Sequence, residues 1–378
     1  MNSALQVQLE AASRYIDQLP RDKGDWLLGQ RQAAAQQFAD MGYPHARQEA
    51  WKYTGIEGLL SQGFGLKDGV QEFPRHAVVR LCLQGPVAGR LVFVDGVYQP
   101  ELSECTADGL RVDSLRQAMA QGERDVLSAV GSLSGIGEHG FAALNLATLY
   151  DGAVIRVEAG ARLEHPVELL HVTTRGAEGQ ALRSRHLVLM GQDAQANMIE
   201  RYLSLEEEIG CFNNLVCEIS LAKGAKLKHQ RVQLEARKSY HLSDVYLELA
   251  EAAHYQGLQA SLGGAWSRTV LHNRFSAEGA NCELDGLYLA GDGQLTDVHL
   301  DVDHAVPHCE SRENFKGILC GAGKAVFDGL IQVREQAQKT SAHLHNANLM
   351  LSRRAEIDTK PQLIILADDV QCLSLIHI

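Results

Sequence analysis

The feature that most constrains the fold is a long region, beginning near residue 151, in which short runs alternate apolar and polar residues without an intervening helical pattern. Alternation of period two is typical of β-strands. Tight corners recur between the runs, at Gly160, Asp193, Gly224, Gly264, Gly279 and Gly293. Most neighbouring corners are separated by about 15 residues or about twice that number, which is typical of a coil of strands that stacks on itself. The pattern predicts a parallel β-helix. Because Gly224 and Gly264 break the period, an antiparallel sandwich with coincidental turns stays open.

The first 150 residues have a different texture. Apolar residues recur at helical spacing near the start, as in Leu5, Leu9, Ile16, Leu27, Ala34 and Phe38. We therefore expect four regions: a helical region over 1–75, a mixed α/β connecting region over 76–150, a β-helix core over 151–372, and a tail over 373–378. Within the connecting region, residues 77–83 and 90–95 are predicted strands, and helical texture returns from residue 113.

Bulk composition narrows the functional class. A net charge of −12 and a pI near 5.7 argue against nucleic acid or an anionic membrane as the main partner. The sequence has no apolar run of membrane-spanning length and no secretory signal at its start. Its eight cysteines form no Cys-x-x-Cys pair, so we expect reduced thiols in a cytoplasmic protein.

Metal-type side chains gather in one segment. Imidazole, thiolate and carboxylate groups at short spacing are ligands for zinc or iron, and here they are His299, His304, His308, Cys309, Asp297, Asp301 and Asp303. In a strand, His299, Asp301 and Asp303 share one face while His304 lies on the other. A single closed site would therefore need a bend near Pro307. The alternative, polar residues on one strand face followed by a turn, stays open.

Cys372 is the second candidate metal ligand. It follows an apolar strand at 363–366 and the acidic pair Asp368-Asp369. A cysteine at the end of a late strand is accessible to a partner and could ligate iron once deprotonated. The alternative is a small buried hydrophobic side chain.

No sequence motif indicates an autonomous catalyst. Residues Gly321–Ala325 are only superficially similar to a phosphate-binding loop, because Ile318 stands where that loop needs glycine and Ala325 where it needs serine or threonine. A Gly-x-Ser-x-Gly elbow and a His-Glu-x-x-His motif are also absent from the sequence. We therefore expect no catalytic residues.

Several segments resemble the SufB/SufD family of the SUF iron–sulfur cluster assembly scaffold, and the resemblance covers residues 1–372. The most specific segments are Glu49-Ala-Trp-Lys-Tyr-Thr54, His304-Ala-Val-Pro-His-Cys-Glu-Ser311, Val326-Phe-Asp-Gly329, Ala337-Gln-Lys-Thr340 and Asp358-Thr-Lys-Pro361 with Ala367-Asp-Asp-Val-Gln-Cys372. The Trp-Lys-Tyr-Thr block and the chain length favour the SufD branch.

The resemblance implies a mainly β fold: a right-handed parallel β-helix between an N-terminal helical region and a C-terminal helical domain. It implies a non-catalytic scaffold that pairs with a SufB-like paralogue through β-helix strands and works with a SufC-like ABC ATPase. A nascent iron–sulfur cluster or iron would then lie at the interface of the two paralogues, while the isolated chain would hold no cofactor tightly. Whether the chain pairs with itself into a homodimer when the paralogue is absent stays open.

The end of the sequence departs from the family pattern. After the cysteine that matches Cys372 the family continues Ser-His-Gly-Ala-Thr, whereas this chain has Leu373–Ile378. The family's interface histidine is therefore absent, its position is Ser374, and His377 is out of register. Leu-Ser-Leu-Ile-His-Ile is also the translation of CTG TCT CTT ATA CAC ATC, which resembles a transposase adapter. We expect a non-native tail and a missing ATPase-docking domain, and sequencing the genomic locus beyond Cys372 tests this.

Two other functional classes compete with the scaffold. A carbohydrate-active β-helix enzyme would carry a groove of carboxylates and would usually be exported, but the sequence has only 6% aromatic residues and no secretory signal. A self-contained metal-binding protein would use His299, His304 and His308, and stoichiometric metal in the isolated chain would support it.

Overall fold

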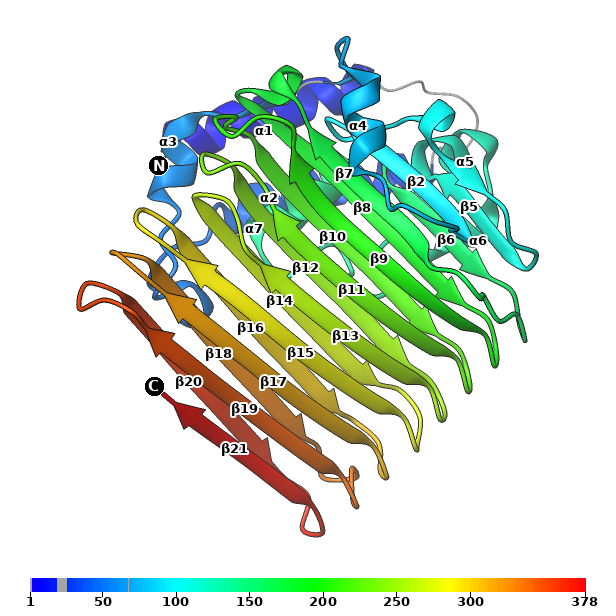
Figure 1. The fold of residues 1–378 in the computed structure, drawn as a ribbon, viewed down its shortest axis with the longest axis vertical. Coiled ribbons are helices and arrows are strands. Elements are labelled where there is room, and N and C mark those ends of the chain that lie inside the picture. The colour runs from blue at the N-terminus through cyan, green and yellow to red at the C-terminus, as the bar shows by residue number, and fades with distance from the viewer. Residues whose placement is uncertain (1, 19–25, 67) are drawn as a thin grey trace.

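The computed structural model describes residues 2–18, 26–66 and 68–378, which form a solenoid of strands with a helical layer against it (Figure 1). Two sheets run along the solenoid. In the described ranges the first sheet has ten strands: β1 (Gly65–Leu66), β5 (Leu110–Ser114), β6 (Ala153–Val157), β8 (Gln180–Met190), β10 (Phe212–Leu221), β12 (Tyr240–Leu249), β14 (Trp266–Phe275), β16 (Leu295–His304), β18 (Lys324–Val333) and β20 (Glu356–Ile365).

The second sheet has eleven strands over the same described ranges: β2 (Gly89–Val94), β3 (Val97–Tyr98), β4 (Glu104–Cys105), β7 (Val167–Thr173), β9 (Gln195–Ser204), β11 (Lys226–Leu234), β13 (His254–Ser261), β15 (Asn281–Ala290), β17 (Glu310–Leu319), β19 (Ser341–Met350) and β21 (Gln371–His377). Each strand from β7 onward pairs in parallel with the strand two places along the chain, in the same sheet. The chain therefore alternates between the sheets, and the predicted parallel β-helix is confirmed.

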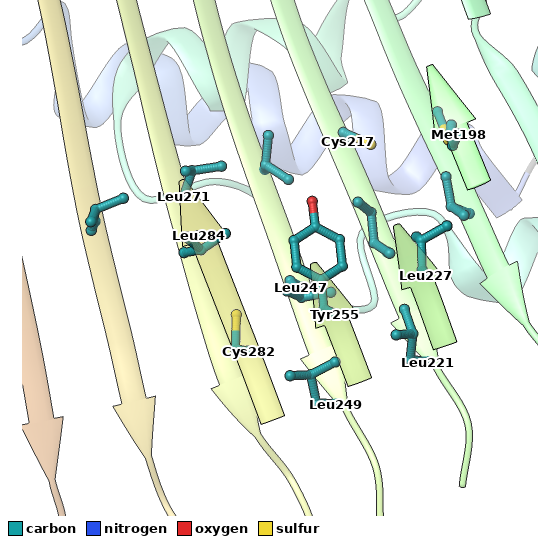
Figure 2. Packing of buried hydrophobic residues seen from close by; sticks show 14 of the residues in the cluster. Met198, Cys217, Leu221, Leu227, Leu247, Leu249, Tyr255, Leu271, Cys282 and Leu284 are labelled. Carbon is teal, nitrogen blue, oxygen red and sulfur yellow. The ribbon is translucent and has the colours of Figure 1, made fainter. Parts of the chain in front are cut away.

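The lumen between the two sheets holds the main hydrophobic core. Alternate residues of each strand point inward, so that Leu227 and Leu284 of the second sheet lie opposite Leu247 and Leu271 of the first (Figure 2). Burying one leucine side chain stabilises the fold by about 1.5–3 kcal/mol, so stacked apolar rungs favour the coil over an open sheet.

The corners explain why the sequence period looked irregular. On the side where the chain passes from the first sheet to the second, six successive corners each have one residue in the left-handed region: Asp193, Gly224, Ala252, Gly279, His308 and Lys339. Their spacing of about 30 residues is one coil of the solenoid. The predicted corners at Gly264 and Gly293 lie on the opposite side of the solenoid, and the sequence count missed Ala252. The predicted corners therefore mixed residues from the two sides of the solenoid, which made the period irregular.

Helices cover the outer face of the first sheet. They are α1 (Asn2–Gln18), α2 (Trp26–Met41), α3 (Glu57–Gln62), α5 (Leu115–Gln121), α6 (Arg124–Ala129) and α7 (Gly140–Ala147), with α2 and α7 behind β10 and β12 in Figure 1. Apolar contacts hold this layer: Phe141 packs against Phe212, and Leu27 of α2 and Leu187 of β8 belong to one buried cluster. None of the helices in the described ranges combines the length and apolar character that a bilayer crossing requires.

The connecting region differs from the expectation in two places. The predicted strand at 77–83 is wrong, because this segment is helix α4 (Arg75–Leu81), which places Val78 and Cys82 together against the outer face of the second sheet. Val78 and Cys82 are four residues apart and so share one face of a helix. The adjacent valines, which are typical of strands, concealed this helical spacing in the sequence. The predicted strand at 90–95 is confirmed as β2, which pairs in parallel with β7 and so continues the second sheet beyond the expected start at residue 151.

Candidate functional site

Cys372 lies in β21, the last strand of the second sheet, opposite Ala342 of β19. It is half-buried and packs against the lumen core, and burial raises the pKa of its thiol. Its thiol is therefore protonated at neutral pH until a metal or a cationic group stabilises the thiolate. The structure places this candidate ligand on the inward face of the final coil.

That coil forms an open end of the solenoid. In the part of the chain that the structure describes, β20 pairs only with β18 and β21 only with β19, so each has an edge of unpaired backbone groups (Figure 1, red). Outside the expected tail at 373–378, large apolar side chains are exposed around these edges: Leu349, Met350, Leu351, Ile364, Ile365 and Leu366. We use the name open end for β20, β21 and these residues.

Ser374 and His377 differ in the direction of their side chains. Ser374 shares the inward face of β21 with Cys372, and its buried hydroxyl has no hydrogen-bond partner among the described atoms. His377 lies on the outward face, where its Nδ1 is 3.1 Å from Nε2 of His345. The imidazole of His377 therefore points away from the face that Cys372 occupies.

His304 and His308 are not brought onto a common site. His304 is fully buried in the lumen, where its ring stacks on Phe275 with centroids 4.5 Å apart and its Nε2 lies 3.0 Å from Oγ of Ser311. Burial lowers the pKa of His304 to about 4, so the imidazole is neutral at physiological pH. His308 is exposed on the corner, where its backbone N–H donates to the carbonyl of Gln338.

His299 and Asp297 anchor the N-terminal region instead. Asp297 accepts a hydrogen bond of 2.5 Å from Thr54, is paired with Arg268, and lies 2.9 Å from Nε2 of His299. The predicted division of the strand faces is confirmed, because His299, Asp301 and Asp303 point outward while His304 points inward. Across the described residues no group of three histidine, cysteine or acidic side chains has the arrangement of a metal site.

A buried polar network in the lumen is the main feature that the sequence did not predict. Glu200 of β9 accepts hydrogen bonds from Arg231 of β11 at 3.1 and 3.2 Å, and Nε2 of His229 lies 2.8 Å away. The hydroxyl of Tyr202 donates to the same carboxylate. Arg231 also donates to Gln259 at 3.1 Å and to Ser243 at 2.7 Å, so the network spans both sheets.

The charges of this network are fixed by its own contacts. Burial alone would raise the pKa of Glu200, but Arg231 and His229 hold it well below its usual range. A neighbouring pair, His171 and His186, is neutral, since burial lowers the pKa of both imidazoles. The ion pair of Glu200 and Arg231 thus lies beside two imidazoles, those of His171 and His186, that are neutral at physiological pH. The alternation of residues along each strand is the sequence feature that indicates this network. Glu200 and Arg231 occupy the same alternating positions as the inward-facing Met198 and Leu227.

Two family models match the chain. The model described as "SUF system FeS cluster assembly, SufBD core domain" matches residues 172–373, which is the β-helix from the end of β7 to β21. The model described as "SufBD protein N-terminal region" matches residues 11–169, which includes the helical layer.

Individual relatives agree with these models. The chain is 32% identical to the iron–sulfur cluster assembly protein SufD of Escherichia coli, over 91% of this chain and 78% of that protein. It is 29% identical to the iron–sulfur cluster assembly SufBD family protein slr0076 of Synechocystis, over 92% and 78%. It is 30% identical to the chloroplastic protein ABCI7 of Arabidopsis thaliana, over 59% and 48%. The chain belongs to the SufBD family of iron–sulfur cluster assembly proteins and is SufD-like.

Proposed function

We propose that this chain is a non-catalytic scaffold subunit that pairs with a SufB-like paralogue at its open end. The observation that carries the proposal is the free backbone edge of β20 beside exposed apolar residues, since most of β21 lies in the expected tail at 373–378. An edge strand with unpaired N–H and C=O groups is a template for strand addition by another chain. Exposed apolar patches of this kind mark protein interaction surfaces.

Cys372 is the residue that we propose as a ligand at this interface. It is the cysteine of the final coil, and a second chain added at the edge of β21 would lie next to its thiol. The raised pKa keeps the thiol protonated in the isolated chain. Iron or a nascent cluster would displace that proton on binding, because only the thiolate is a good ligand. His304 and His308 support no part of this proposal.

The proposal includes a second partner, an ABC ATPase related to SufC. The segment that follows the matched cysteine in the family would carry the docking site for this ATPase. The proposal also places the protein in the cytoplasm, although the relative from Arabidopsis is described as chloroplastic. Co-purification of this chain, and of a version extended with a family-like C-terminus, with SufB and SufC tests both partners.

Substitution at the edge tests the pairing. We expect Ile364→Lys combined with Leu366→Lys to abolish co-purification with a SufB-like partner, since lysines on an edge strand oppose strand addition. Leu258→Lys is the matched control, because Leu258 is an exposed leucine on β13, away from the open end. Equal co-purification of both variants would contradict pairing at this edge.

The iron content of the complex tests the role of Cys372. After anaerobic reconstitution, we expect Cys372→Ser to lower iron and acid-labile sulfide per complex without changing the subunit ratio. Cys320→Ser, which changes an exposed cysteine elsewhere, is the control. If the two variants retain the same iron, Cys372 is not a ligand and another group must hold the cluster.

A further inference from the structure

A row of apolar side chains runs along the outer face of the second sheet, with one residue from each coil. Helix α4 covers the first part of this row (Figure 1). Val94 and Val172 are buried in one cluster with Val78 of that helix, and Leu203 packs against the same cluster. Strand register aligns the whole row, which consists of Val94, Val172, Leu203, Leu234, Leu262, Leu289, Ile318 and Leu349.

The part of the row that follows Leu203 has no cover among the residues that the structure describes. We use the name exposed ladder for Leu234, Leu262, Leu289 and Ile318. Leu234 is 51% exposed and Ile318 is 36% exposed, while the two leucines between them are partly exposed. A contiguous apolar strip on the surface marks an interaction site.

Exposed cations without an ion pair lie on both sides of the exposed ladder. Lys316 of β17 is in register with Leu287, which is itself 37% exposed and widens the apolar strip. Arg237 lies in the turn that follows β11, and Arg353 lies in the turn that follows β19. The side chains of these three cations make no ion pair with any residue in the described ranges. They would attract acidic groups of a bound molecule.

The acidic groups near the exposed ladder are paired with other cations or lie beside the covered part of the row. Glu206 and Glu207 are in the turn after β9, next to the covered Leu203. The paired acids and their partners are Glu208 with Lys238 at 2.6 Å, Asp292 with Arg354 at 3.4 Å, and Glu283 and Asp285 with Arg312 at 2.9 and 3.2 Å. The flanks of the exposed ladder are therefore positive, although the chain as a whole carries a charge of −12.

We propose that the exposed ladder binds an amphipathic helix of a partner chain, whose apolar stripe has acidic residues on its flanks. Neighbouring strands are about 4.8 Å apart and one helical turn rises about 5.4 Å, so successive turns of a helix laid across the strands meet successive coils. Helix α4 shows that this sheet face accepts a helix, and Arg201 of β9 donates to the carbonyl of Leu81 at the end of α4. Lys316 lies in the same row of the sheet as Arg201. The helix would use the face of the second sheet, whereas pairing with a SufB-like paralogue would use the edge of β20.

Two synthetic peptides of about 18 residues, long enough to span the exposed ladder as helices, test the chemistry. Both have the same leucines three and four residues apart, but one has glutamates on the flanks and the other has lysines. Fluorescence anisotropy with the full chain measures their affinities. We expect saturable binding of the glutamate peptide and about tenfold weaker binding of the lysine peptide, because Arg237, Lys316 and Arg353 repel lysines. Equal affinities would overturn the charge assignment, and absence of glutamate-peptide binding would overturn the site.

Substitutions in the exposed ladder localise the binding. We expect Leu234→Gln with Ile318→Gln to weaken binding of the glutamate peptide at least about tenfold, without a change in melting temperature, since both side chains are exposed. Val79→Gln with Leu258→Gln is the matched control, because it changes two exposed apolar residues outside the ladder. If the ladder variant binds the peptide like the parent, the proposal fails.

Further measurements distinguish the helix from other occupants. Ile364→Lys with Leu366→Lys should bind the glutamate peptide like the parent, and a loss of binding would place the peptide at the open end. If Leu234→Gln with Ile318→Gln dissociates a dimer of the parent in sedimentation velocity, a second copy covers the ladder. If the same variant abolishes co-sedimentation of the parent with anionic vesicles, a membrane surface covers it. Each of these three results would overturn the helix as the occupant.

Discussion

Glu313 is a carboxyl group enclosed in the lumen, in register with Leu284 of β15 and Leu344 of β19. Neither of its oxygens has a hydrogen-bond partner among the described atoms, and the neighbouring Ser311 hydroxyl engages His304. Burial raises the pKa of Glu313 to about 8, so the folded protein keeps its proton over a range in which the unfolded chain has lost it. This difference opposes folding increasingly as pH rises from about 4.5 to about 8.

We therefore expect Glu313→Gln to stabilise the protein at pH 8, by about 4 kcal/mol, and to have little effect near pH 5. Urea unfolding at the two pH values measures this. Glu310→Gln, on the exposed side of the same strand, should show no such dependence. An equal change of Glu313→Gln at both pH values would mean that the carboxyl group finds a partner in solution.

The ion pair of Glu200 and Arg231 differs from Glu313, because both of its charges are buried and each satisfies the other. Removing one partner leaves an uncompensated charge in the lumen, so we expect Arg231→Met to cost about 3–5 kcal/mol. Replacing both, as Arg231→Met with Glu200→Leu, should restore much of that loss. A double-mutant cycle in urea measures the coupling, and additive effects would show that the two charges are independent.

Among the elements, the segment at 49–55 ties the helical layer to β14 of the solenoid. The guanidinium of Arg268 lies 4.0 Å from the ring centroid of Trp51, and the indole N–H of Trp266 donates to the carbonyl of Gly55 at 3.1 Å. We expect Trp51→Ala to cost about 3–5 kcal/mol, since a buried aromatic contact and a cation–π contact are lost together.

Hydrogen exchange measures which elements lose stability in Trp51→Ala. Amides of α3 and of 49–55 should exchange faster in Trp51→Ala, while β14 and β16 stay protected by their own ladder. Tyr53→Ala removes an exposed ring from the same segment and should leave exchange unchanged. Faster exchange throughout β14 and β16 would show that the layer and the solenoid unfold as one unit.

The sequence predicted the kind of element better than its place. Alternation revealed the strands because the lumen selects every second residue, and it divided His299, Asp301 and Asp303 from His304 correctly. Coil length was harder to predict, because a corner needs only one residue in the left-handed region. Ala252, His308 and Lys339 occupy that position without the glycine that marks it in sequence. Because nothing in the sequence marked His308 as a corner residue, it was interpreted as a candidate metal ligand.

The candidate site was predictable to the same extent. The expected position of Cys372 at the end of a strand was wrong, because a corner separates it from β20 and it lies at the start of β21. The network of Glu200 and Arg231 was not predicted, because its members lie one coil apart. Pairing them requires the register of β9 against β11, which places Glu200 opposite Arg231. Local spacing does not contain that register, since it is fixed by how neighbouring coils stack.

At the scale of the whole molecule, the open end and the net charge act in opposite directions. Two copies could pair edge to edge through β20 or β21 and cover their apolar residues, which favours a homodimer. The net charge of −12 on each copy opposes that approach, and salt screens the repulsion over about 10 Å at 0.1 M. Self-association should therefore strengthen with ionic strength, unlike pairing that depends on ion pairs.

Sedimentation velocity over a range of protein and salt concentrations tests this balance. We expect the purified chain to shift from monomer toward dimer as either concentration rises. Ile364→Lys with Leu366→Lys should remain monomeric throughout, because it adds charge at the free edge of β20. Leu258→Lys adds one positive charge to a paired strand and should still associate. If both variants dimerise alike, the contact lies on another face; a monomer under all conditions would mean that apolar exposure at the open end is too small to overcome the charge.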